Sequence, residues 1–291
     1  MGALQEIRHH RKVVEDTRKI TRAMYLIASA KMKRAMRMHD QNEQSFERTR
    51  SDIRFILESM FTPTSNPFFR PHGENTAYLV IAGDKGLCGG YNHEVLKLAE
   101  ATIEQTPPDK RSLFTIGHMA ADYFTRKGQH PDVHYMHVIQ DPTLRNAREI
   151  TTELCYLFTQ KALDNVYVVY TQLRNGSVLK PMAHRLLPIF HEDFMDAAPI
   201  GRPVHGLTYY PSRFEALDMM VKHYLIGWVY SALVQAFASE HFARMTAMYS
   251  ATHNADEMLS RLNIQWGHAR QAAITQELTE IIAGAEGGFR A

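Results

Sequence analysis

The stretch FEALDMMVKHYLIGWVYSALVQAFASEHFARMTAMYSATHNADEML (residues 214–259) decides how this chain folds. It contains no proline and a single glycine, Gly227, so nothing in it forces a helix to end. Its first apolar residues repeat with the 3.5-residue spacing of a coiled-coil seam, at Leu217, Val221, Tyr224 and Trp228. The stretch therefore predicts one long helix that packs along one side against a second helix.

The predicted seam continues toward the C-terminus at Phe242, Met245, Tyr249, Leu259 and Trp266. Between these residues the seam positions are small or polar, namely Ser231, Gln235, Thr252 and Asp256. Such a seam is weaker than one built from leucine. We therefore expect the helix pair to be stabilised by surrounding protein.

The N-terminal segment has the same character. It contains no glycine or proline between Ala3 and Thr62, and all twelve prolines of the chain lie between Pro63 and Pro211. Its apolar residues recur with helical spacing at Val13, Ile20, Met24 and Ile27, and again at Phe46, Ile53, Ile56 and Met60. The sequence therefore predicts two long terminal helices that flank a compact centre.

The centre alternates between short apolar runs and helical patterns. Strands are predicted at residues 78–82, 113–116, 133–139 and 166–170, and helices at residues 93–105, 118–127 and 148–163. Alternation of this kind is typical of a parallel α/β sheet. Residues 61–75 contain three prolines and form the predicted linker. The chain thus leaves a helix, builds a globular domain and returns as a second helix.

Composition narrows the class of protein. The chain has 291 residues, of which 45% are hydrophobic, and no apolar run approaches the roughly 20 residues that a membrane-spanning helix needs. Its net charge of +2 gives no general bias toward nucleic acid. The cysteines Cys88 and Cys155 are far apart in sequence, which favours two reduced thiols. We expect a cytosolic protein that reaches membranes only through a partner.

A glycine-rich loop, GDKGLCGGYN (residues 83–92), joins the first predicted strand to its helix. Loops at this position often bind phosphates, so a nucleotide site must be considered. However, the loop lacks GxGxxG, and Lys85 precedes the glycines instead of following them as in a P-loop. A structural tight turn is the favoured interpretation.

Two further patterns carry chemistry. Residues 17–39 contain seven Lys or Arg and no acid, which indicates either a solvated helix face or a surface that binds nucleic acid, a membrane or an acidic protein. His130, His134 and His137 are close enough to suggest metal binding. On a strand His137 would point away from the other two, so without a bend all three cannot converge. No metal site is expected.

Four segments together carry a resemblance to a known family. They are TRKITRAMYLIASAKMKRA (residues 17–35), DKGLCGGYN (84–92), SEHFARMTAMYSATHNADEML (239–259) and ARQAAITQELTEIIAGA (269–285). In this order they resemble the signatures of the gamma subunits of bacterial F-type ATP synthases, and between residues 97 and 205 the match is one of pattern only. The resemblance implies an α/β fold, with a long antiparallel coiled coil of the N- and C-terminal helices plus a central Rossmann-like domain. The implied boundaries are 1–62 and 208–291 for the shaft helices and 76–206 for the foot domain.

The resemblance also implies a function without catalysis. The chain would be the central rotor shaft, coupling ion-driven rotation of a c-ring to conformational change in catalytic β subunits, with no cofactor and no metal of its own. Implied partners are the alpha, beta, epsilon and delta subunits and the c-ring, at the cytoplasmic face of the inner membrane, with no nucleic acid. Implied β contacts are Met24, Lys31, Arg270, Gln271 and Thr275. Implied foot residues, toward epsilon and the c-ring, are Asp84, Lys85, Gly86, Tyr209 and Pro211.

Two alternatives remain open at this stage. One is an α/β nucleotide-binding enzyme with helical extensions, which would require ATP binding by the isolated chain. The other is a basic coiled-coil protein that binds nucleic acid, which would require salt-dependent affinity for DNA. Protons and sodium ions are both compatible with the sequence as the coupling ion.

Overall fold

The computed structural model describes residues 2–60, 66–71, 73–198, 209–210 and 212–288. The chain divides into two compact units, a helical unit of Met1–Ala28 with Arg244–Ala291 and a mixed unit of Ser29–Ala243. Helices α1 (Gly2–Glu58) and α5 (Arg213–Gly288) contribute residues to both. The three-segment division drawn from the resemblance stays a prediction.

The mixed unit contains a five-stranded sheet in the order β3-β2-β1-β4-β5. Strands β1, β2, β3 and β4 run parallel, and β5 pairs antiparallel with β4. The strands are β1 (Thr76–Ile81), β2 (Arg111–Ile116), β3 (Val133–Tyr135), β4 (Asn165–Arg174) and β5 (Val178–Leu187). The order of the parallel strands is that of half a Rossmann fold, which confirms the predicted fold class.

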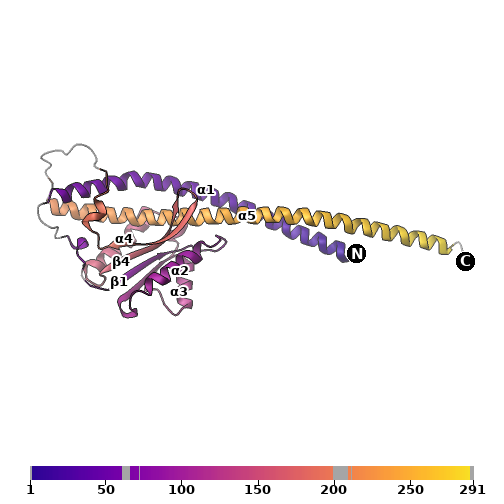
Figure 1. Ribbon diagram of the computed structural model, residues 1–291, viewed down its shortest axis with the longest axis horizontal. Helices are drawn as coiled ribbons and strands as arrows, with labels where there is room; N and C mark the ends of the chain where they lie inside the picture. Colours follow the sequence, from indigo (N-terminus) through magenta and orange to yellow (C-terminus); the bar gives the residue numbers. More distant parts are fainter. Residues whose placement is uncertain (1, 61–65, 72, 199–208, 211, 289–291) are drawn as a thin grey trace. The chain divides into compact units, whose positions relative to one another are not determined.

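Helices cover both faces of this sheet. In Figure 1, α2 (Tyr91–Ile103) and α3 (His118–Arg126) lie on one side, and the parts of α1 and α5 in this unit lie on the other. Helix α4 (Leu144–Thr159) packs into the same core as α1 and α5. Because both faces are covered, β1 is buried along its whole length, as its apolar run predicted. Short 3-10 helices are η1 (Pro67–Phe69), η2 (Pro108–Lys110), η3 (Val138–Gln140) and η4 (His191–Phe194).

Two predictions about strands need correction. The third predicted strand, residues 133–139, ends at Tyr135, because His137 adopts a left-handed conformation with φ of 61° and η3 follows it. The fifth strand was not predicted, because Pro181 argues against a central strand. It is an edge strand, where proline is tolerated. The pair Asn175–Gly176, with φ of 50° and 67°, forms the tight turn before it and was the available signal.

In the helical unit α1 and α5 run antiparallel. Thr252 donates a hydrogen bond to Thr21 at 2.9 Å, and Arg18 contacts Asp256 at 3.1 Å, so numbers fall along α5 as they rise along α1. On α1 the predicted phase is wrong by one residue, whereas on α5 the predicted seam positions Thr252 and Leu259 do contact α1. The buried residues are Val14, Thr21 and Ala28 on α1 and Met248, Ala255 and Leu262 on α5. The predicted seam residues Val13, Ile20, Ile27 and Tyr249 are exposed.

The seam phase went wrong for a physical reason. The large apolar residues of α1 were assigned to the seam, but the residues of α1 buried there, Val14, Thr21 and Ala28, are smaller and are spaced seven apart. In the mixed unit the prediction does better, since Ile53 and Ile56 on α1 and Leu217 on α5 are buried as expected.

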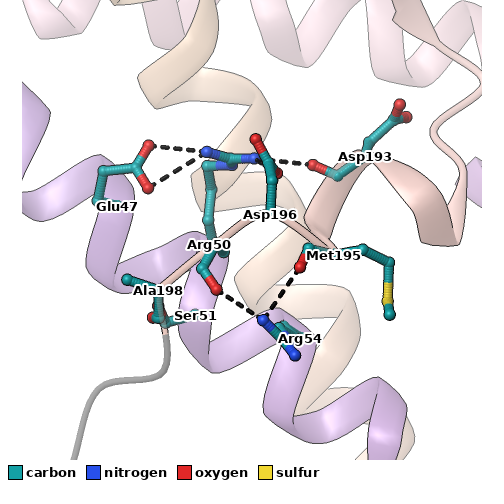
Figure 2. A network of polar contacts seen from close by, with 9 residues as sticks. Glu47, Arg50, Ser51, Arg54, Asp193, Met195, Asp196 and Ala198 are labelled. Atoms are coloured by element: carbon teal, nitrogen blue, oxygen red, sulfur yellow. Dashed lines mark hydrogen bonds and ion pairs between the residues drawn. The ribbon is translucent and has the colours of Figure 1, made fainter.

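Arginines of α1 bind the segment that follows β5 (Figure 2). Arg50 donates to the carbonyl of Asp193 at 3.0 Å and pairs with the carboxylates of Glu47 and Asp196. Arg54 donates to the carbonyls of Met195 and Ala197 at 3.0 and 2.8 Å. These bonds attach the end of the α/β domain to α1 and satisfy carbonyls that belong to no strand.

Candidate interaction surfaces

The helical unit exposes many large apolar side chains that its own two helices do not cover. On α1, Val13, Ile20, Leu26 and Ile27 are between 48% and 61% exposed. On α5 seven large apolar residues are also exposed, namely Tyr249, Met258, Ile264, Ile274, Leu278, Ile281 and Ile282. A concentration of large apolar side chains on a surface is typical of a protein–protein interface. The sequence held this signal, but the seam prediction had assigned several of these residues to the interior.

A groove of about 330 Å³ lies within this unit, beside the exposed Leu26 and Tyr249. The rings of Tyr25 and Tyr249 have centroids 6.1 Å apart along it. Its remaining lining is Arg22, Thr252, His253 and Asp256. An apolar side chain of a partner, flanked by polar groups, fits a groove of this composition.

The basic residues of α1 are only partly paired. Arg18 contacts Asp256, Lys19 contacts Glu15 and Asp16, and Arg34 contacts Asp141 at 2.9 Å. Of the seven basic residues between positions 17 and 39, four form no ion pair in the described part of the chain, namely Arg22, Lys31, Lys33 and Arg37. An acidic surface would complement them.

The predicted β-contact residues lie at two places on the helices. Met24 on α1 is half-buried, and Lys31 is exposed with its ammonium 6.0 Å from the ring of Phe237. Arg270, Gln271 and Thr275 are exposed on α5. The guanidinium of Arg270 lies 5.4 Å from the ring of Trp266, and Thr275 donates to the Gln271 carbonyl at 2.9 Å.

The glycine-rich loop is held together by its own side chains. Asn92 accepts a hydrogen bond from the Gly83 amide at 2.9 Å and donates to the Lys85 carbonyl at 3.3 Å. Leu87 and Gly89 have φ of 60° and 57°, so the chain turns through left-handed conformations. Tyr91 donates its hydroxyl to the Ala236 carbonyl of α5 at 3.1 Å, which attaches the loop to that helix.

This geometry does not suit a phosphate. A Cβ atom at Gly83 would lie 3.0 Å from the carboxyl carbon of Glu240, which is only 6% exposed. The Gly83 amide already donates to Asn92, whereas phosphate loops present free amides and a lysine to the anion. The structure therefore favours the structural turn over the nucleotide-binding alternative.

The predicted foot residues are partly described. Asp84 accepts a hydrogen bond from the His118 amide at 3.0 Å, while Lys85 and Gly86 are exposed. Tyr209 is half-buried and its hydroxyl has no partner among the described residues. Pro211 lies outside the described residues, and α5 begins after it, at Arg213.

Both thiols are buried and neither forms a disulfide, as expected. Burial raises the pKa of Cys155 to about 12, so its thiolate is scarce at neutral pH and the thiol is unreactive. Among the described helices, none is long and apolar enough to cross a membrane.

Comparisons with known proteins cover nearly the whole chain. A family profile described as ATP synthase matches residues 3–287. The chain is 38% identical to an ATP synthase gamma chain of Ruminiclostridium cellulolyticum, with 97% of each chain covered. It is 39% identical to an ATP synthase gamma chain of Caldanaerobacter subterraneus, covering 94% of this chain and 96% of that one. A rotor chain of the mitochondrial ATP synthase of Euglena gracilis has the same fold, with a TM-score of 0.64, 16% identity and coverage of 94% and 99%.

Proposed function

Because this chain belongs to the ATP synthase gamma-chain family, we propose that it is the central rotor shaft of an F-type ATP synthase. The single observation that carries the proposal is the exposed apolar surface of the helical unit. A helix pair that leaves large apolar side chains such as Ile20 and Ile281 more than 60% exposed is suited to a site enclosed by other proteins. A ring of alternating α and β subunits would provide that enclosure.

The unpaired cations of α1 support contact with β. In the described part of the chain Lys31, Lys33 and Arg37 form no ion pair, and acidic β-subunit loops would supply carboxylates. Arg270, Gln271 and Thr275 would meet a β loop at one angle of rotation, because Arg offers a planar fork to a carboxylate and Gln both donates and accepts. Met24 would lie in the neck between these two contacts.

The foot completes the proposed coupling. Asp84, Lys85 and Gly86, with Tyr209 and Pro211, would face the epsilon subunit and the c-ring, and the delta subunit would belong to the same assembly. The chain would then lie at the cytoplasmic face of the inner membrane and reach the bilayer only through the c-ring. It would be a non-catalytic subunit, since the ATP sites would belong to β.

The mechanism follows from asymmetry. A shaft with different residues on each side contacts three identical β subunits unequally. It shifts each β site only by the difference between its interaction energies with that site's open and closed forms. Rotation then takes each site in turn through binding, synthesis and release.

A rotation assay tests this proposal. Thr125→Cys introduces an exposed thiol on α3 for attachment of a bead, while Cys88 and Cys155 are buried. Reconstituted with α and β subunits held on a surface and given ATP, the chain should turn the bead in one direction. Hydrolysis with a stationary bead would contradict the rotor, and ATP binding by the isolated chain would favour the enzyme alternative.

A further inference from the structure

Three histidines meet at the carboxyl ends of β2 and β3. The ring centroids of His118 and His134 are 5.5 Å apart, and those of His118 and His137 are 6.1 Å apart. His118 begins α3 directly after β2, and His134 lies in β3. The left-handed conformation of His137 supplies the bend that strand geometry alone would not allow. His118 joins the cluster in place of His130.

The inner histidine carries a buried nitrogen that lacks a partner. Thr115 Oγ1 lies 3.0 Å from His134 Nδ1, so this ring nitrogen has a hydrogen-bond partner. His134 Nε2 is buried and has no hydrogen-bond partner among the described residues. A histidine that binds a metal is usually held by a hydrogen bond through one ring nitrogen, which leaves the other nitrogen for the ion.

The spacing of the rings suits one ion. Two imidazoles on a tetrahedral ion, with metal–nitrogen distances of about 2.0–2.1 Å, have ring centroids about 5 Å apart. The observed separations, 5.5 and 6.1 Å, are within about 1 Å of that value. Both separations are longer than that value, so binding requires a small rotation of the side chains. His137 is exposed and free to make it.

The carboxylate of Asp84 adds negative charge beside the three histidines. Asp84 accepts a hydrogen bond from the His118 amide at 3.0 Å with one oxygen and from Gln140 Nε2 at 2.8 Å with the other. Gln140 Nε2 also lies 3.4 Å from His137 Nδ1. The carboxylate thus connects the segments that carry the two outer histidines and favours a cation between them.

From this geometry we propose that His118, His134 and His137 bind one divalent transition-metal ion of the zinc class, with water completing the tetrahedron. Imidazole nitrogens are the ligands that such ions prefer. The other possible set, His39 with Asp40 and Glu43, lies exposed on a single stretch of α1 and has no buried nitrogen without a partner. The proposed metal site does not depend on the rotor proposal, because its residues lie in the mixed unit and none of them is a proposed contact with another subunit.

Cobalt titration of the full chain, prepared without an affinity tag, tests the site. Co²⁺ in a tetrahedral site absorbs strongly in the visible range, and Zn²⁺ should displace it. We expect one Co²⁺ per chain, and at least about tenfold weaker binding in each of His118→Gln, His134→Gln and His137→Gln. His130→Gln and His39→Gln are matched controls that should bind like the wild type.

Several results would overturn the proposal. They are the absence of a tetrahedral Co²⁺ spectrum, unchanged affinity in His137→Gln, and loss of binding in His39→Gln. His134 is partly buried, so His134→Gln could fail to fold. In that case His118→Gln and His137→Gln decide the question, once circular dichroism has shown that they fold like the wild type.

Discussion

The two units of this chain place their apolar residues in opposite ways. In the mixed unit Phe124 and Phe158 are fully buried, and the central strand β1 is buried on both faces. In the helical unit the seam uses residues such as Ala28 and Ala255, while Ile20 is 61% exposed. Burial of a large apolar side chain contributes about 1.5–3 kcal/mol. The mixed unit therefore stabilises itself, whereas much of the stabilisation available to the helical unit must come from what surrounds it.

The largest effect should come from the core of the mixed unit. Phe158 is fully buried, with its ring 6.0 Å from that of Phe68. Phe158→Ala should lower the free energy of unfolding by about 3–5 kcal/mol, because it leaves a cavity. Tyr156→Ala, on the exposed face of the same helix, should change it by less than about 0.5 kcal/mol. Equal urea midpoints for the two variants would break the comparison.

The arginine contacts of Figure 2 should rank second. The Arg50 side chain is only 15% exposed, and its removal leaves the Asp193 carbonyl without its donor. Arg50→Ala should cost about 1.5–3 kcal/mol, the range for hydrogen bonds from a charged group. Arg145→Ala, which removes an exposed pair with Glu149, should cost less than about 0.5 kcal/mol. Thermal melts of both variants would distinguish them, and similar losses would contradict the ranking.

Two adjacent valines give the sharpest test of the helical unit. Val14 is 7% exposed in the seam and Val13 is 48% exposed beside it. Val14→Ala should lower the free energy of unfolding by about 1–2 kcal/mol. Val13→Ala should leave stability nearly unchanged but weaken binding to the α and β subunits about threefold to tenfold. If unfolding and binding titrations showed instead that Val13→Ala lowers stability and Val14→Ala weakens binding, Val13 would lie in the seam, as the sequence had predicted.

The smallest effect concerns Arg270. Its stacking on Trp266 already holds the side chain, so a partner carboxylate adds one charged hydrogen bond at an exposed position. Arg270→Ala should lower ATP turnover of the assembled complex about threefold, with assembly unchanged. His268→Ala, two residues away and on another face of α5, should not alter turnover. Equal turnover for both variants, at equal assembly, would remove Arg270 from the proposed contact.

The sequence predicted the parts of the fold that depend on local pattern. The absence of proline located both long helices, and an apolar run before Gly83 located β1. Strand β5 was not predicted, and the signal for it was the Asn175–Gly176 turn, while Pro181 is compatible with a strand only at the edge of the sheet. The seam phase was missed because it depends on how closely two helices approach, which the size of a side chain does not reveal.

The histidine cluster, too, could not be predicted from the spacing of residues along the sequence. Linear spacing grouped His130 with His134 and His137, but the chain turn at His137 and the start of α3 bring His118 to the cluster instead. That outcome depends on the register of β2 with β3, where Thr115 lies opposite His134. Register is a tertiary property, so no count of residues along the chain could have supplied it.

The exposed apolar surface also bears on the fate of a chain that meets no partner. Chaperones and proteases act on proteins that display apolar surface, and degradation removes those that stay unassembled. A surplus copy would present Ile20, Ile264 and Ile281 to this machinery, whereas an assembled copy would hide them. The same side chains that would hold the shaft in its ring would thereby mark orphan copies for destruction, and the cell's supply of this chain would stay matched to that of its partners.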